Sequence, residues 1–350
     1  MDSLSQLVLG GSIAAAIGHK QLGRSALVIG GVLATLPDLD VFLPTKDVIS
    51  SFTEHRSFSH SLFVLFPFSL VCFLLLRLKF KTEVISNQRL FWLCSLALIT
   101  HPMLDSFTSY GTQLFWPLAG HPISIASIFA VDPLYTLPLL IGCVYLWRHG
   151  GVRGQESGTN KSRASDNVFR SNTASSHTAN KSINIHYKIE SNKIDKARRV
   201  NYIGLILSSG YLLLGFVLQG MMQKKVELVL LEQGIGVDKI FISPLYPSLN
   251  WWGAIVFDNG VYYDVNLNVL TNTLAISVKR DLGGDIIDFP IPALTSLNWF
   301  TNGFIRLENV NEQLIVTDLR MKTGGIGYAF KFVLAEKENQ KWEPIQPYQL

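Results

Sequence analysis

Long apolar runs separated by short polar turns occupy most of the first 220 residues. They predict helices at about residues 4–18, 24–37, 61–80, 89–107, 123–147 and 200–220. The last four runs reach or approach the roughly 20 residues of a membrane span. The first two are shorter and rich in glycine and alanine, and small residues allow helices to approach closely in a bilayer. We expect a tightly packed hairpin there; the alternative is an amphipathic hairpin on the membrane surface.

The pattern changes after residue 225. Short runs rich in β-branched and aromatic residues, such as 251–258 and 261–267, are separated by turn signals such as Asp258-Asn259-Gly260. This alternation predicts a small, mainly antiparallel β domain. The last histidine of the chain is His186, so we do not expect a histidine-based catalytic centre in this domain.

A polar stretch separates the fifth helix from the sixth. In residues 157–182, 14 of 26 positions are Ser, Thr or Asn, which is typical of a flexible linker without a core. The predicted fold is therefore an α-helical integral membrane domain of about five or six membrane helices, followed by a small mainly-β domain. Its predicted parts are a helical membrane domain at 1–147, a basic cytoplasmic linker at 148–199, a last membrane helix at 200–220 and a β-rich domain at 225–350.

Composition supports a membrane protein. Hydrophobic residues make up 48% of the 350 positions and charged residues 16%, against about 25% charged in soluble domains. These values exclude a disordered chain, a fibrous protein and an ordinary soluble enzyme.

Cys72, Cys94 and Cys143 lie in apolar runs without CxxC spacing, so we expect neither a disulfide framework nor a cysteine zinc finger. The start of the chain lacks a basic segment, so we expect no cleaved signal peptide.

Basic residues predict the orientation, because Lys and Arg accumulate in cytoplasmic loops. They lie after the first helix, between the third and fourth, and after the fifth: Lys20, Arg24, Arg77, Lys79, Lys81, Arg89, Arg148 and Arg153. Loops 38–60 and 108–122 and residues 225–350 would then face outward. Residues 148–199 carry 11 basic and 4 acidic residues. Because this block lacks interleaved aromatic residues, we do not expect nucleic acid as a partner. The expected partners are membrane lipids.

Acidic residues and histidines gather at the predicted outer helix ends. They are Asp38, Asp40, His55, His60, His101, Asp105 and Asp132, with Arg56 among them. Polar residues are costly in a membrane domain and usually functional. Mixed Asp/His sets suit divalent metals, since imidazole favours Zn, Fe or Mn and carboxylates favour harder ions.

Spacing limits which of these residues can converge. His101 and Asp105 are four residues apart and share a helical face. Asp38 and Asp40 follow Pro37, where an irregular turn can point both inward. His55 and His60 need a turn between them to converge. Structural interpretations stay open: the aspartates can solvate a helix end, and His101 and Asp105 can hydrogen bond to each other.

The remaining polar residues near these helix ends also have both a functional and a structural interpretation. His55 and Arg56 can belong to a loop at the level of the lipid headgroups, and His60 can be a hydrogen-bonded interfacial histidine. Arg56 can bind a phosphate or carboxylate through two hydrogen bonds, or pair with an aspartate. Thr108 and Tyr110 can orient a substrate, or cap and pack.

Four ordered motifs carry a family resemblance. They are PDLD at 37–40, HRSFSHS at 55–61, HPMLDSFTSYGTQLFWPL at 101–118 and DPLYT at 132–136. Together they resemble the bacterial inner-membrane metal-dependent hydrolase family of the YdjM type, over about residues 1–145. The resemblance implies a metal set of Asp38, Asp40, His55, His60, His101 and Asp105, with Asp132 in the last motif. It implies a divalent metal, with Zn as the first choice and Mn or Fe as alternatives.

These observations predict a membrane-bound hydrolase of the bacterial inner membrane. Its Asp/His metal centre would lie at the outer face, with the C-terminal domain extracytoplasmic. We expect Asp40 or Asp132 as the general base, and Arg56 favours a phosphoester, in a lipid-linked substrate. The alternative is a non-enzymatic membrane protein with a structural metal or a transport role, although transport sites tend to lie near the bilayer midplane.

Overall fold

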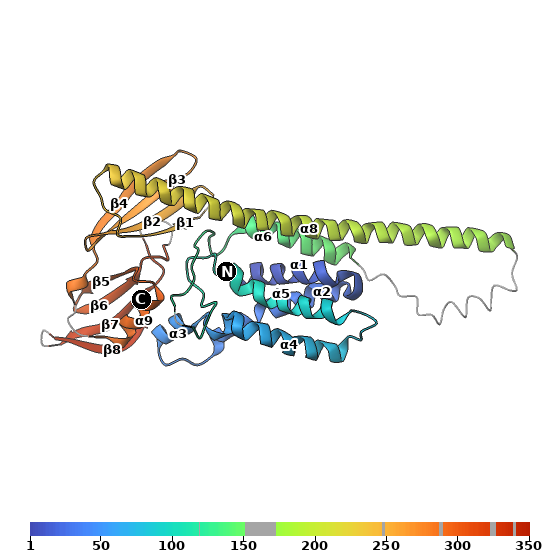
Figure 1. Ribbon diagram of the computed structural model, residues 1–350, viewed down its shortest axis with the longest axis horizontal. Coiled ribbons are helices and arrows are strands. Elements are labelled where there is room, and N and C mark those ends of the chain that lie inside the picture. The colour runs from blue at the N-terminus through green and yellow to red at the C-terminus, as the bar shows by residue number, and fades with distance from the viewer. Residues whose placement is uncertain (119, 151–172, 247–248, 287–289, 323–326, 339–340) are drawn as a thin grey trace.

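The structure is a computed structural model that describes the chain except residues 119, 151–172, 247–248, 287–289, 323–326 and 339–340. Within the described residues, a helical bundle formed by the N-terminal part of the chain lies beside a mainly-β C-terminal domain (Figure 1). The predicted order of a helical region followed by a β domain is confirmed. Part of the predicted linker, residues 151–172, lies outside the described residues.

The bundle is built from α1 (Ser3–Leu22), α2 (Arg24–Thr35), α4 (Leu62–Lys79), α5 (Asn87–Asp105) and α6 (Pro133–His149). Three short elements lie between α2 and α4: the 3₁₀ helix η1 (Pro37–Phe42), α3 (Val48–Glu54) and the 3₁₀ helix η2 (Phe58–His60). Helix α6 starts ten residues later than the sequence predicted. Asp132 caps it by accepting a hydrogen bond from Leu134 N at 3.1 Å, and Pro133 occupies the first turn, where proline is favoured.

Helices α1 and α2 form the close hairpin that their small residues predict. A Cβ atom on Gly10 would lie 2.3 Å from Ala34 Cβ and 2.4 Å from Gly30 O, so no larger side chain fits there without moving the backbone. This contact fixes the end of α2, from which η1 continues directly through Pro37.

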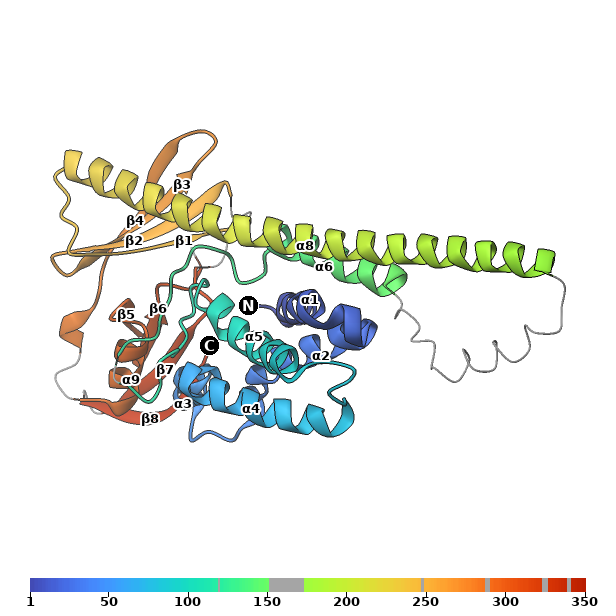
Figure 2. The same ribbon diagram turned by 45° about the vertical axis from the view of Figure 1, so that its right-hand side comes forward.

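Helix α8 (Thr173–Glu232) is longer than predicted and runs the length of the molecule (Figures 1 and 2). The hydropathy pattern predicted only the apolar stretch 200–220, whereas the helix continues beyond both ends of that stretch. It packs closely on α6: a Cβ on Gly204 would lie 2.5 Å from Pro138 O. Asn201 Nδ2 also donates to Ser12 O at 3.0 Å. The helix thereby closes the bundle and carries the chain to the β domain.

Two helices of the described chain are long and apolar enough to cross a membrane: Leu62–Lys79 and the stretch Ser191–Glu232 of α8. The sequence predicted about five or six membrane helices. The difference has a physical reason: α2 has 12 residues and α6 has 17, against the roughly 20 that a span needs. Helices α1 and α5 are long enough but carry polar side chains along their length.

The C-terminal domain contains two four-stranded antiparallel meanders within the described residues. The first is formed by β1 (Lys239–Pro244), β2 (Trp251–Asp258), β3 (Val261–Asn268) and β4 (Thr273–Asp281). The second is formed by β5 (Ile305–Val310), β6 (Gln313–Asp318), β7 (Lys331–Glu338) and β8 (Lys341–Gln349). The 3₁₀ helix η3 (Gly284–Ile286) and α9 (Pro292–Phe300) connect them.

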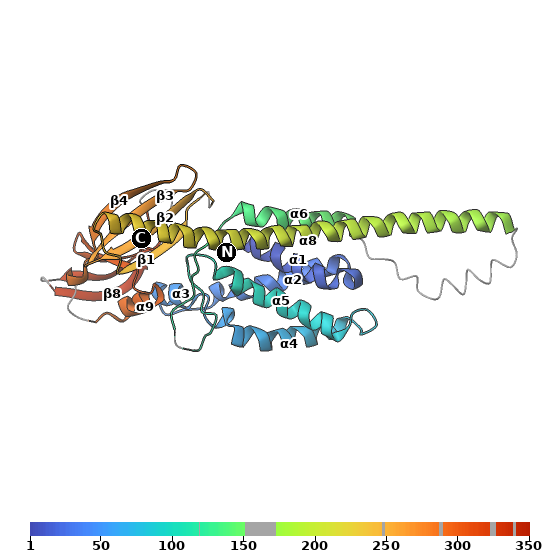
Figure 3. The same ribbon diagram turned by 45° about the horizontal axis from the view of Figure 1, so that its top comes forward.

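Each sheet packs on a different part of the helical region. Met222, Val226 and Leu230 of α8 pack in one core with the β1–β4 sheet. Ile49 and Phe52 of α3 are buried in a second core with α9 and the β5–β8 sheet. Figure 3 shows α3 and α9 close together between the bundle and this sheet. The β domain is therefore attached to the segment that carries the HRSFSHS motif.

Candidate metal centre

The motif residues meet where the bundle faces the β domain. Helix α2 ends at Thr35 and delivers Asp38 on η1, while α5 ends at Asp105 and carries His101 one turn earlier. His60 ends η2, immediately before α4. Elements far apart in the sequence thus place these side chains in one small volume.

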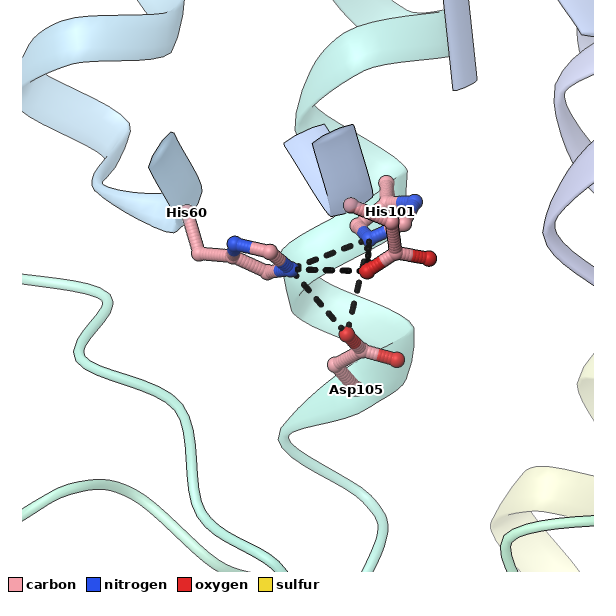
Figure 4. Close-up of side chains that lie close together, drawn as sticks. His60, His101 and Asp105 are labelled. Carbon is pink, nitrogen blue, oxygen red and sulfur yellow. Dashed lines mark hydrogen bonds and ion pairs between the residues drawn. The ribbon is translucent and has the colours of Figure 1, made fainter. Parts of the chain in front are cut away.

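Four atoms from these residues form one compact group (Figure 4). His60 Nε2 and His101 Nε2 are 3.1 Å apart. Asp38 Oδ1 lies 3.4 Å from His60 Nε2 and 3.2 Å from His101 Nε2. Asp105 Oδ2 lies 3.3 Å and 3.5 Å from the same two nitrogens. The structure thus brings together four of the six residues of the implied metal set: Asp38, His60, His101 and Asp105.

These spacings fit a divalent cation. Zinc ligands bind at about 2.0–2.2 Å in a tetrahedron, which places ligand atoms about 3.4 Å apart. Asp105 Oδ2 is buried, and among the described residues it has no hydrogen-bond partner. A buried carboxylate oxygen needs compensating positive charge. Arg56 Nε lies 3.2 Å from Oδ2, and a cation between Oδ2 and the two histidine nitrogens would add to this compensation. The donor set could therefore hold one metal ion.

The outer nitrogens of both histidines are occupied, as is usual for metal ligands. His101 Nδ1 donates to Ala34 O at 2.5 Å. His60 Nδ1 donates to Ser59 Oγ at 2.9 Å, and Ser59 Oγ donates to Asp40 Oδ2 at 2.6 Å. Both Nε2 lone pairs are therefore directed into the group, where they would repel each other in the absence of a proton or metal.

Asp105 is held from both sides. Its Oδ1 accepts a hydrogen bond from Gln6 Nε2 at 2.8 Å and one from the α-amino group of Met1. Its Oδ2 lies 3.2 Å from Arg56 Nε, an ion pair without hydrogen-bond geometry. These contacts turn Oδ2 toward the histidines.

Arg56 occupies an unusual backbone conformation that links the site to its surroundings. Its φ of 62° lies in the left-handed region, where residues with a side chain are strained. The turn lets Arg56 N donate to Asp40 Oδ2 at 3.0 Å. The guanidinium group lies over the Tyr110 ring at 5.0 Å and donates to Thr108 Oγ1 at 3.4 Å. Tyr110 and Thr108 thus support Arg56.

Asp40 and His55 lie beside the group of four and outside it. His55 Nδ1 donates to Asp40 Oδ1 at 2.9 Å. Asp40 Oδ2 is 3.7 Å from His60 Nδ1, on the side of the ring away from the group. Burial raises the pKa of Asp40, but hydrogen bonds from His55 and Ser59 outweigh it, so its pKa lies below the ordinary value. For Asp38 too, burial raises the pKa, but hydrogen bonds from His101 and His60 outweigh it and its pKa is lowered.

Asp132 is not a member of this group. Besides capping α6, its Oδ2 accepts a hydrogen bond from Tyr211 Oη at 2.7 Å. These contacts tie the start of α6 to α8, so the described interactions of Asp132 are those of a residue that fixes two helices.

A cavity of about 470 Å³ borders this region. Asp40, His55 and Arg56 line it, together with Tyr110 and with Phe330 of the β domain. The side of the site that carries Asp40 and His55 is thus open to a molecule of the size of a lipid headgroup.

Sequence reasoning missed two supporting residues, Gln6 and Ser59. Gln6 is a fully buried polar residue in an apolar helix, and that isolated polarity is a signal the sequence already contains. Ser59 lies inside the HRSFSHS motif, but no spacing rule shows that its hydroxyl joins His60 to Asp40.

The fold and the site together define a helical protein with an Asp/His centre that could hold one metal ion. Residues 1–163, just under half of the chain, match the family described as YdjM inner membrane protein. The family resemblance that the four motifs predicted is therefore confirmed over this region.

The chain also resembles part of another bacterial protein. The chain is 27% identical over 161 residues to the uncharacterized protein YfhP of Bacillus subtilis (strain 168). The match covers 44% of this chain and 48% of that relative, so it spans about half of each protein. No solved structure matches this chain.

Proposed function

We propose that this protein is a membrane-bound metal-dependent hydrolase whose Asp38, His60, His101 and Asp105 hold one divalent cation, Zn being the first candidate. The convergence of their four ligand atoms in one group, three of whose residues are buried, carries the proposal. The substrate class that fits best is a phosphoester, because Arg56 supplies a guanidinium group beside the cavity and guanidinium binds phosphate through paired hydrogen bonds.

The proposal places the site at the outer face of a bacterial inner membrane. The matched family is described as an inner membrane protein family. In both candidate spans 17% of the apolar window is buried, so their apolar surfaces need another partner, which lipid supplies. The basic turns around Lys20, Arg24, Arg77, Lys79 and Arg89 lie at the helix ends opposite the site. By the positive-inside rule those ends are cytoplasmic.

A bound divalent cation would lower the pKa of a water molecule toward about 7 and polarise the scissile group. The chain supplies the remaining functions. Asp40 accepts a hydrogen bond from His55 Nδ1 and orients the ring. His55 Nε2 would then be the ring nitrogen that exchanges a proton with a group in the cavity. Arg56 would bind the anionic part of the substrate. Gln6 and Ser59 keep Asp105 and His60 aligned.

A structural metal is the second candidate. Structural zinc sites are closed by four protein ligands, whereas catalytic sites keep a position open. The side chains of His60, His101 and Asp105 have 0% exposure, which favours a closed site, whereas that of Asp38 is 24% exposed. Asp38 is therefore the ligand at which solvent or substrate would enter.

Metal content tests the proposal. Purified wild type should contain about one Zn, Mn or Fe per chain by inductively coupled plasma mass spectrometry. The double variant His60→Ala/His101→Ala should lose the metal and the hydrolysis of a phosphoester panel while keeping its thermal unfolding transition. His149→Ala, at the far end of α6, is the control. Loss of folding together with metal supports the structural site, and wild type that takes up no metal contradicts both candidates.

A further inference from the structure

A second, apolar hollow lies next to the cavity beside the site. This groove has a volume of about 320 Å³ and lies against the first turns of α4, where Val64, Leu65 and Phe68 line it. Leu36 and Leu39 form its other side. Apart from Asp40 and Ser59, its lining is carbon-rich, so it has little to offer a polar ligand.

The cavity and the groove share part of their lining beside the site. Asp40, Leu43 and Phe58 line both of them. Leu43 is 49% exposed and Phe58 42% exposed, so the side chains at the junction are not locked in a packed core. A single molecule that occupied both hollows would have a polar part near His55 and Arg56 and an apolar part against α4.

The surroundings of the groove identify the kind of molecule. Phe42 is 81% exposed and Val41 63% exposed on η1, and large apolar side chains in a contiguous exposed patch mark a contact surface. The groove wall on α4 belongs to a candidate membrane span. An apolar groove that opens beside such a helix and such a patch is open to the acyl region of a bilayer.

We infer that the ligand of this site is a phosphate-bearing lipid, with its headgroup in the cavity and one hydrocarbon chain in the groove along α4. This deepens the proposed function and rests on it for the chemistry at the headgroup. It assigns the groove a role in selecting substrates that have a chain, and it assigns Val64 the role of a specificity residue.

Photolabelling tests the inference without requiring turnover. The full chain in lipid nanodiscs is irradiated with phosphatidic acid that carries a diazirine in its acyl chain, and labelled peptides are mapped by mass spectrometry. Wild type should be labelled on peptides that cover 36–43 and 58–68. Water-soluble dihexanoyl phosphatidic acid should suppress this labelling, because it occupies the same headgroup site.

Two variants of the same helix provide the comparison. Val64→Trp fills the groove and should reduce the labelling at least fivefold. Val71→Trp places the same side chain on the same face two turns further along, outside the groove lining, and should leave it unchanged. Equal labelling of wild type and Val64→Trp, or labelling that dihexanoyl phosphatidic acid does not suppress, would overturn the inference.

The source of the phosphate is tested by glycerol phosphate, which has the headgroup and no chain. It should compete at least tenfold more weakly than dihexanoyl phosphatidic acid. Equal competition would show that the cavity binds a free phosphoester and that the groove has no role.

The proposed hydrolase activity and the proposed lipid site can fail independently of each other. Suppressible groove labelling without hydrolysis keeps the lipid site and removes the hydrolase. Hydrolysis of soluble phosphoesters without groove labelling keeps the hydrolase and removes the lipid site.

Discussion

At the scale of single residues, the two oxygens of Asp105 have different environments. Oδ1 accepts hydrogen bonds from Gln6 and Met1, whereas Oδ2 faces His60 and His101 without a hydrogen bond among the described residues. A carboxylate fixed on one oxygen presents the other in a single direction. Hydrogen bonds of this kind orient metal ligands, and their loss commonly weakens metal binding.

Gln6→Met tests this arrangement, because methionine keeps the volume of the side chain and removes the donor. We expect the dissociation constant for Zn to rise about 10- to 100-fold, the usual effect of losing such a partner. Competition against a fluorescent chelator measures it. Gln21→Met, at the other end of the same helix, should bind Zn as wild type does. Unchanged affinity in Gln6→Met would show that Asp105 needs no alignment by Gln6.

Spacing predicts part of this site well. His101 and Asp105 meet as their four-residue separation predicts, and the break at Pro37 directs Asp38 inward. The position of His55 depends on the positive φ of Arg56, which no periodicity reports. For this reason the sequence could not separate the four converging residues from Asp40 and His55.

At the scale of elements, the contact between α1 and α2 is coupled to the site. The Cβ of Ala34 lies where a side chain on Gly10 would have to go. The carbonyl of the same Ala34 accepts the hydrogen bond that orients His101. Close helix packing and ligand orientation therefore depend on one residue of α2.

Gly10→Val should force α2 away from α1. Overpacking of this kind costs about 1–3 kcal/mol, so we expect a lower unfolding temperature together with weaker Zn binding. Thermal unfolding and chelator competition measure the two effects. Gly210→Val is the matched control, since an added Cβ at Gly210 meets nothing within 4 Å. If Gly10→Val weakened folding but not Zn binding, the coupling through Ala34 would be wrong.

Element boundaries were predicted where caps and apolar runs coincide, as for Leu62–Lys79 against the expected 61–80. They were missed where an apolar run is not helical. Residues 123–132 are mostly apolar but form a loop whose amides bond to carbonyls just after α5, such as Ile125 N to Ser106 O at 2.7 Å. Hydropathy cannot distinguish such a buried loop from a helix.

At the scale of the whole molecule, the β domain supports the loop that carries the HRSFSHS motif. Phe52 of α3 lies among rings of the domain, with centroid distances of 5.0 Å to Phe300, 4.7 Å to Phe330 and 5.2 Å to Phe332. Tyr110 donates to the carbonyl of Phe52 at 2.6 Å. The position of Arg56 and His60 thus depends on packing with Phe300 and Phe332, which lie at least 240 residues further along the sequence and which local patterns could not predict.

Phe300→Ala removes a fully buried ring from this core. Such a truncation costs about 3–5 kcal/mol, and we expect amide hydrogen exchange in residues 48–60 to accelerate at least tenfold. Trp252→Ala is the comparison, because Trp252 is equally buried but lies in the core shared with α8. It should leave exchange in 48–60 unchanged. Equal acceleration in both variants would mean that the domain responds as one unit and does not specifically hold α3.

The two attachments of the β domain also restrict how it can move. One sheet is packed on α8 and the other on α3, and a third cluster containing Ile255, Tyr262, Phe304 and Leu319 joins the sheets. A body with one attachment can swing as a lid, whereas a body held at two separated points retains only rotation about the line that joins them. The domain therefore keeps Phe330 in the wall of the cavity with little freedom to swing away from it.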